Sequence, residues 1–473
     1  MHHTGPDRGE PPVGGGPEVT LVPGEADRPA ADERDRQPRR SRWRWSSVVG
    51  RGDGFLHRSG KFLTGNLLRT LAQGALFVLL AREMPIDTYG LFVGVTALIA
   101  VVSPFASAGA PSLIIQNYAD SPSDWPRHLL RGLFLSTVFG SAATVLVAAA
   151  GLAIWGAHIG LVDLLCLAFA DLVAWRLIEA VGASFHVRGR IMLAAVIPAL
   201  LHICRLVGAV VLAMSEGPVT LHGWATISAV ISVVVCLPVV LGGLRGAAGR
   251  ALSIRGSLQQ VRTGMLFAVG LSAQSVYNDS DKVMLSRLGT PESAAIYAAA
   301  YRVVDLAYTP GRSMSAVAYP RFFEAGRDGP RAAQRMALKL VPRFLAFSVP
   351  ASLLLVAFAW MMPLVFGADF EAAVPALQGL SALLVLKSLH YLAADALSGA
   401  RMQGRRTVCQ IGVGVLNALL NLWLIPAYGW QGAIVSSLAC DALLAVLLWG
   451  CLAAAVRRDR VGTPPSARPM ERV

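Results

Sequence analysis

The chain has 473 residues, of which 54% are hydrophobic and only 15% are Asp, Glu, Lys or Arg. Because a soluble domain carries roughly 25% charged residues, this composition excludes an ordinary soluble protein and is typical of a polytopic membrane protein. The formal net charge of +13 would suit a nucleic-acid partner, but the cations lie mainly between apolar stretches, so no nucleic-acid partner is predicted.

Residues 1–57 are predicted to form a disordered, basic cytoplasmic tail. Residues 1–40 are rich in Gly, Pro, Asp, Glu and Arg and lack the apolar side chains that a core needs. We expect no secretory signal peptide, because the tail contains no apolar h-region. Arg and Trp alternate in Arg39–Trp45, a pattern that suits the lipid headgroup layer.

About twelve mostly apolar stretches follow. A helix needs roughly 20 such residues to cross the hydrocarbon layer. We therefore predict an all-α fold with transmembrane spans at residues 60–82, 90–110, 129–154, 160–185, 191–214, 220–244, 261–284, 293–316, 338–364, 373–400, 407–426 and 430–455. The seventh, eighth and tenth of these spans contain charged residues.

Lys and Arg are concentrated in every second connection between these spans. Arg188 and Arg190 lie in one such connection, whereas the neighbouring connection Ser215–Gly223 contains no Lys or Arg. Cytoplasmic loops are enriched in these residues. The pattern therefore predicts a multi-pass protein of the cell membrane with both termini in the cytoplasm.

The two halves of the chain are similar. The segments from Thr64 and from Thr263 both begin with Thr-Gly, run through an apolar span to a Leu-x-Arg, and then reach a Pro and a Tyr. Six spans bring the chain back to the same side, so this is a parallel repeat. We predict an N-lobe (residues 58–250), a C-lobe (residues 251–456), a central cleft between these six-helix lobes, and a cytoplasmic C-terminal tail (residues 457–473).

Three segments carry a family resemblance. They are DKVMLSRLGTPESAAIYAAAYRV (Asp281–Val303), LVFGADFEAAVPAL (Leu364–Leu377) and NALLNLWLIPAYGWQGAIVSS (Asn417–Ser437). They resemble the O-antigen and capsule repeat-unit flippases of the multidrug/oligosaccharidyl-lipid/polysaccharide exporter superfamily, and the similarity covers residues 60–455. The chain departs from that pattern at Ile296, where the family often has Gly.

The resemblance implies transport by alternating access. The expected substrate is a polyprenyl-pyrophosphate-linked oligosaccharide, which would move from the inner to the outer leaflet for the synthesis of cell-surface polysaccharide. Membrane lipid would surround the protein, and the glycosyltransferases and polymerase of that pathway would be its partners.

Charged side chains inside the spans are the candidates for the binding site. A charge at mid-bilayer is costly on a lipid-facing surface, so these residues should face the cleft or a partner helix. Arg offers a planar fork that matches phosphate, and amides, hydroxyls and aromatic rings suit a glycan. The candidate substrate-binding residues are Arg69, Arg176, Arg205, Arg302, Lys387, Tyr391, Asn417 and Asn421.

Purely structural roles for the same residues stay open. Arg176 and Glu179 are three residues apart, as are Arg302 and Asp305, and each pair would equally serve as a structural ion pair. Asn417 and Asn421 would equally hold helices together.

Asp305 and His390 are the candidates for coupling transport to protons. Asp305 lies one turn from Arg302 and would lose this partner when a pyrophosphate binds the guanidinium. His390 titrates near neutrality when unperturbed. A structural counter-charge is the alternative role for Asp305.

Three further charges, Asp279, Asp281 and Lys282, lie near the outer end of span seven. We expect them to be solvated or to form an outer gate. Pro310–Gly311 is expected to break span eight.

The sequence contains no Walker, HExxH or Gly-x-Ser-x-Gly motif, so we predict a non-enzyme without metal or cofactor. Three other functions remain open: a multidrug or toxic-compound cation antiporter, a flippase of the peptidoglycan precursor, and a non-transporting scaffold of a polysaccharide-synthesis complex. A cation antiporter should favour carboxylates in the cleft, whereas the excess charge in these spans is basic.

The predicted orientation can be tested by cysteine labelling in intact cells. Single cysteines at Ser215 and Ala427 should react with a membrane-impermeant maleimide added from outside, and one at Gly189 should react only after the cells are opened. The reversed labelling pattern would overturn the orientation.

Overall fold

The structure is a computed structural model that describes residues 52–215, 217–247, 249 and 254–461. Residues 1–51 of the predicted N-terminal tail, with the Arg39–Trp45 run, and residues 462–473 of the predicted C-terminal tail lie outside the described residues. Helix begins at Gly52 and ends at Val461, so it extends a few residues into both predicted tails. The description below concerns the compact unit Leu56–Val473.

The regular elements of the described residues are all helical, and the first half of the chain contributes eight α-helices and two short turns. They are α1 (Gly52–Glu83), α2 (Ile86–Ala106), α3 (Ala110–Asp120), η3 (Pro122–Asp124), α4 (Trp125–Trp155), α5 (Leu161–Phe169), the π-helical turn η4 (Ala170–Ala174), α6 (Trp175–Val187), α7 (Ile191–Ala213) and α8 (Leu221–Gly246).

The second half is likewise built of α-helices and short helical turns. Its elements are α9 (Ile254–Leu288), α10 (Pro291–Ala307), α11 (Thr309–Arg327), α12 (Pro330–Phe358), η5 (Ala359–Met361), α13 (Met362–Phe366), η6 (Ala368–Phe370), α14 (Ala373–Leu380), α15 (Leu383–Gly399) and α16 (Gln403–Val461). The backbone leaves helical geometry at Gly429, so α16 consists of two helices, 403–428 and 430–461.

Each predicted span coincides with a helix. By length and composition, seven stretches of the described residues could cross a membrane: Ile86–Tyr118, Pro122–Trp155, Ile191–Ala213, Leu221–Gly246, Pro330–Phe366, Ala373–Gly399 and Gln403–Asp459. The last of these contains two predicted spans. The four other spans correspond to α1, α5–α6, α9 and α10–α11, and the charges within α9 and α10–α11 explain their lower hydropathy. The predicted all-α, twelve-span class is confirmed.

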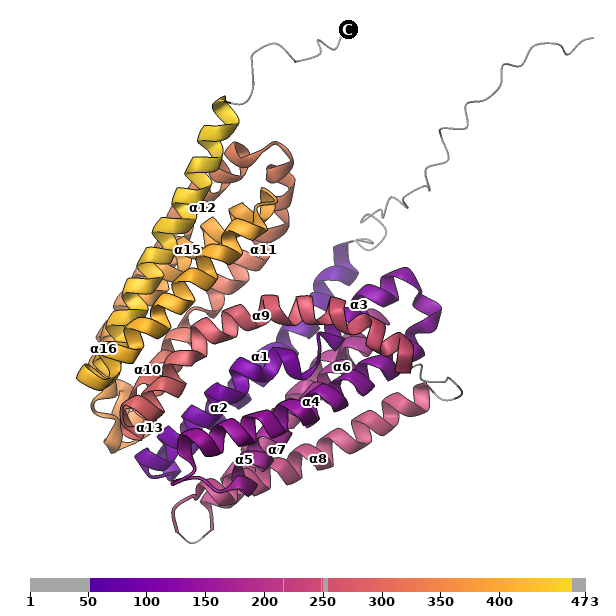
Figure 1. Ribbon diagram of the computed structural model, residues 1–473, viewed down its shortest axis with the longest axis vertical. Helices are drawn as coiled ribbons and strands as arrows, with labels where there is room; N and C mark the ends of the chain where they lie inside the picture. Colours follow the sequence, from indigo (N-terminus) through magenta and orange to yellow (C-terminus); the bar gives the residue numbers. More distant parts are fainter. Residues whose placement is uncertain (1–51, 216, 248, 250–253, 462–473) are drawn as a thin grey trace, which may run out of the picture. The chain divides into compact units, whose positions relative to one another are not determined.

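The helices pack in two groups (Figure 1). In the first half, α4 packs against α2, α3 and α5, and α7 packs against α6 and α8. In the second half, α15 packs against α11, α12 and α16. Helices α9 and α10 contact both groups, because each packs against α2 while α9 also packs against α16 and α10 against α14. The predicted lobe limits, residues 58–250 and 251–456, stay a prediction.

The contact between α2–α3 and α9 is close enough to need glycine. Ala108 and Gly109, at the break between α2 and α3, have φ values of 45° and 68°. A β-carbon at Gly264 of α9 would collide with the carbonyl oxygen of Ala108, and one at Gly109 would collide with the backbone of Gly264. Glycine at both positions therefore lets α9 approach the break between α2 and α3 closely.

Two of the predicted spans are interrupted near charged residues. Helix α10 ends at Ala307 and α11 begins at Thr309, so the break predicted at Pro310–Gly311 is present. The π-helical turn η4 contains Asp171 within the fourth predicted span. Single π-helical turns are frequent at functional sites, because they redirect the side chains of a helix.

Candidate functional site

A cavity of about 460 Å³ lies among helices of the first half, α9 and α10. Four of the predicted substrate-binding residues line it, on four different predicted spans: Arg69, Arg176, Arg205 and Arg302. Its wall also includes one further cation, Lys282, and the carboxylates Asp171, Asp279 and Asp305. Cations therefore outnumber carboxylates, five to three, in the described lining. The sequence predicted the four arginines but not their neighbours Asp171, His202 and Trp224.

Arg302 and Arg69 have donor groups to spare. Neither forms an ion pair with a described carboxylate, and both side chains have a buried Nε atom without a hydrogen-bond partner. The guanidinium carbon of Arg302 lies 3.1 Å from the ring centroid of Phe77, and that of Arg69 lies 5.9 Å from the ring of Trp175. Aromatic faces hold a guanidinium in place without using its N–H groups, which stay available to an anion.

Arg176 and Arg205 are already paired. Arg176 Nη1 donates to Glu179 Oε2 at 2.5 Å, and its Nη2 donates to Ser103. Arg205 Nη1 donates to Asp171 Oδ1 at 2.7 Å across helices α7 and η4. One of the two intrahelical pairs expected from sequence is thus present, and these two arginines are less available to a ligand than Arg302 and Arg69.

The second expected pair, Arg302 with Asp305, is not formed, and this expectation was wrong. Asp305 binds Arg312 of α11 instead, and Lys387 Nζ of α15 lies 3.8 Å from Asp305 Oδ1. The chain turns after Ala307, and this turn brings Arg312 back to Asp305. Arg312 Nη2 also donates to the Asp305 carbonyl oxygen at 3.1 Å. Arg302 remains free to face Phe77.

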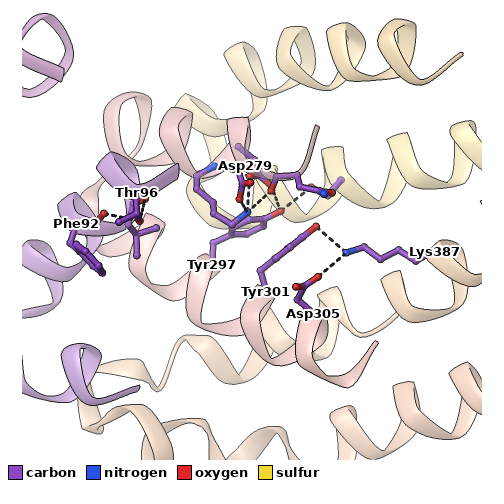
Figure 2. A network of polar contacts seen from close by, with 12 residues as sticks. Phe92, Thr96, Asp279, Tyr297, Tyr301, Asp305 and Lys387 are labelled. Carbon is purple, nitrogen blue, oxygen red and sulfur yellow. Dashed lines mark hydrogen bonds and ion pairs between the residues drawn. The ribbon is translucent and has the colours of Figure 1, made fainter. Parts of the chain in front are cut away.

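Lys387 lies behind the cavity wall. Its side chain is 4% exposed, and its ammonium donates to the Tyr301 hydroxyl at 3.0 Å, as Figure 2 shows. Tyr301 and Asp305, which it contacts, both line the cavity, whereas Lys387 does not. The nitrogen of Lys282 lies 4.2 Å from the same tyrosine ring. Tyr301 therefore connects a cation of the cavity to one of the second-half helices.

Two charges of α9, Asp281 and Lys282, are buried, contrary to the solvated state expected from sequence. Asp281 and Lys282 are 3% and 8% exposed. Lys282 Nζ lies 3.0 Å from Asp279 Oδ1 and 3.5 Å from Asp281 Oδ1, and Tyr297 of α10 donates to Asp281 (Figure 2). The two carboxylates neutralise the charge of Lys282 from the same helix. Their spacing around the lysine could be seen in the sequence. Packing of α10 and α16 against α9 excludes the water.

The other predicted residues do not line the cavity. Tyr391 stacks on Tyr308 with ring centroids 5.7 Å apart, and His390 Nε2 lies 3.7 Å from Asp441 Oδ1. Asn421 Nδ2 donates to Asn417 Oδ1 at 3.1 Å, and both side chains are buried. Ser436, beyond the kink of α16, donates to Asn421. This geometry favours the packing role for the two asparagines over glycan contact.

The profile of a family described as "Polysaccharide biosynthesis protein" matches residues 59–325. No curated protein has a sequence that matches the chain.

Solved transporter structures share the fold. An inward-facing multidrug resistance transporter of the MATE family, in the MOP superfamily, has a TM-score of 0.63 at 14% identity, over 84% of this chain and 96% of that one. The lipid II flippase MurJ in an inward closed conformation has a TM-score of 0.64 at 11% identity, over 83% and 87%. A MOP superfamily transporter from Pyrococcus furiosus has a TM-score of 0.59 at 14% identity, over 86% and 96%, and its title describes reverse polarity of the binding pocket.

Proposed function

Because the chain belongs to the polysaccharide biosynthesis protein family, a family of membrane transporters and flippases, we propose that it moves a polyprenyl-pyrophosphate-linked oligosaccharide from the inner to the outer leaflet by alternating access. The observation that carries this proposal is the pair of cavity arginines, Arg302 and Arg69, whose N–H groups are not used by described carboxylates. Glycosyltransferases must supply such a lipid, and a polymerase or ligase must consume it.

The cost of these cations supports a functional role. An Arg at the centre of a transmembrane helix costs roughly 2.5–3.5 kcal/mol or more even when it can partly reach water. Arg302 and Arg69 lie on different helices and line one cavity, where a diphosphate can accept from both. Trp175 and Trp224 line the same cavity and offer rings to a sugar.

Arg176 and Arg205 take a secondary role in this proposal. Each is bound to a carboxylate of its own group of helices, so a ligand must replace Glu179 or Asp171 to gain a full contact. Such exchangeable pairs offset part of the positive charge of the cavity when it holds no ligand. Lys387 acts through Tyr301 and Asp305 and does not need to touch the phosphate.

The alternatives are less well supported by this cavity. A cation antiporter would need carboxylates that are free to bind its substrate, but Asp171 and Asp305 are both paired with cations. A peptidoglycan-precursor flippase would use the same diphosphate chemistry. The family match favours a polysaccharide precursor over it. The inner-to-outer direction depends on the predicted cytoplasmic termini.

Substitution of Arg302 tests the proposed diphosphate contact. Arg302→Gln should lower transport of lipid-linked oligosaccharide in proteoliposomes by about ten- to hundredfold, the equivalent of one hydrogen bond to a charged group. Arg302→Lys should recover only part of this activity, because an ammonium cannot form the planar, bidentate contact. Arg287→Gln, at an exposed arginine on α9, is the matched control and should retain activity. Full activity of Arg302→Gln at equal protein level would remove Arg302 from the site.

Asp305 remains the proposed proton-coupling group, with a new set of partners. Its carboxylate lines the cavity and is held by Arg312 and Lys387 from behind the wall, so a diphosphate bound beside it would repel the carboxylate and favour its protonation. His390 is a weaker candidate, because it lies outside the described cavity lining.

Replacement of Asp305 by Asn keeps its shape and removes its titration. Transport by Asp305→Asn should therefore no longer respond when the pH gradient across the proteoliposome is collapsed. Asp369→Asn, at an exposed carboxylate, should respond as the parent does. An Asp305→Asn variant with the parent's rate and the parent's response would show that Asp305 is only a structural counter-charge.

A further inference from the structure

Helix α12 carries a row of exposed cations on the first half of its length. Arg331, Arg335, Lys339 and Arg343 follow one another at intervals of four residues, and all four side chains are exposed. Residues spaced by four lie on neighbouring turns of one helix face. We call these four residues the α12 basic row.

The rest of α12 is apolar and largely exposed. Only 17% of its most apolar stretch is buried inside the protein, and Leu353 and Phe358 are 64% and 52% exposed. Trp360, directly after the helix, is 58% exposed and suits the opposite headgroup layer. This face of α12 is therefore peripheral, as a face that contacts lipid would be.

The spacing along α12 matches the thickness of a bilayer. About twenty-one residues separate Lys339 from Trp360, a helical rise of about 32 Å, and the hydrocarbon layer is about 30 Å thick. Arg331 and Arg335 then lie beyond the hydrocarbon, in the headgroup layer. Arg343 lies one turn inside its edge, where the long side chain can extend outward to reach phosphate.

This position is electrostatically unfavourable for cations without a partner. The row begins in the first turn of α12, where the helix dipole is positive and favours Asp or Glu, yet that turn contains no acidic residue. No member of the row forms an ion pair with a carboxylate among the residues described. The nearby end of α11 adds no net charge, because the exposed Glu324 and Asp328 offset the exposed Arg321 and Arg327. An external anion would offset this repulsion.

We propose that the α12 basic row is a binding site for the headgroups of anionic phospholipids, independent of the substrate cavity. Two exposed aromatic residues support a lipid over a soluble partner. Tyr319 and Phe323 of the adjoining α11 are 38% and 43% exposed. Their rings pack edge to face with centroids 5.1 Å apart. Exposed aromatic residues of this kind are typical of a membrane interface. Phosphodiester headgroups supply the anion, and their acyl chains cover the apolar face of α12.

The test is a lipid titration of the purified full-length protein in detergent, followed by native mass spectrometry. The probes are phosphatidylglycerol and phosphatidylcholine. The variant is the triple substitution Arg331→Gln, Arg335→Gln and Lys339→Gln. The matched control removes three other exposed cations, by Arg127→Gln, Arg190→Gln and Arg245→Gln.

The parent and the control should prefer phosphatidylglycerol, and the α12 variant should bind it about a hundredfold more weakly, since each cation near an anionic surface contributes roughly a factor of five. The preference should fall as salt is added. An equal loss in both triple variants, or an unchanged preference in the α12 variant, would overturn the proposal. So would tighter binding of soluble polyglutamate than of phosphatidylglycerol at the row. Equal thermal unfolding temperatures in lipid-free detergent would confirm that the variants are folded.

Discussion

A charge placed at the depth of the bilayer must be paired, wetted or used, because hydrocarbon cannot solvate it. The structure contains a clear example of each case. Lys282 is paired within its own helix by two carboxylates. Asp305 is partly exposed at the cavity and held by Arg312 and Lys387. Arg302 lines the cavity without a carboxylate partner, so its guanidinium is the group most available to a substrate.

Helix α9 packs closely against the first-half helices, where Gly264 and Gly109 let the two backbones meet. Further along the same helix, Asp279 and Lys282 line the cavity together with the arginines of α1, α6 and α7. Tyr301 then connects that cavity to Lys387 on α15. A change in charge at the cavity can therefore act on the second group of helices through one tyrosine and one carboxylate.

The helices and the four cavity arginines were predictable from sequence, because both follow from local rules. Twenty apolar residues in a row specify a span, and a charge within such a row must avoid lipid. The partners of these charges were not predictable in the same way. Asp305 binds Arg312 because the chain turns between α10 and α11, and Asp281 is buried because Tyr297 and α16 cover it. By residue type alone, Asn417 and Asn421 suit sugar binding and helix packing equally. The hydrogen bond from Ser436 to Asn421 favours packing.

The central claim is that the Arg302–Arg69 cavity holds the diphosphate of a lipid-linked sugar. An electron cryomicroscopy map of the protein in lipid nanodiscs, with a polyprenyl-pyrophosphate-linked sugar added, tests it most directly. The account predicts diphosphate density within about 3 Å of the Arg302 guanidinium, with Arg69 on its other side. Diphosphate density elsewhere on the protein, with both guanidinium groups in contact only with water, would contradict it.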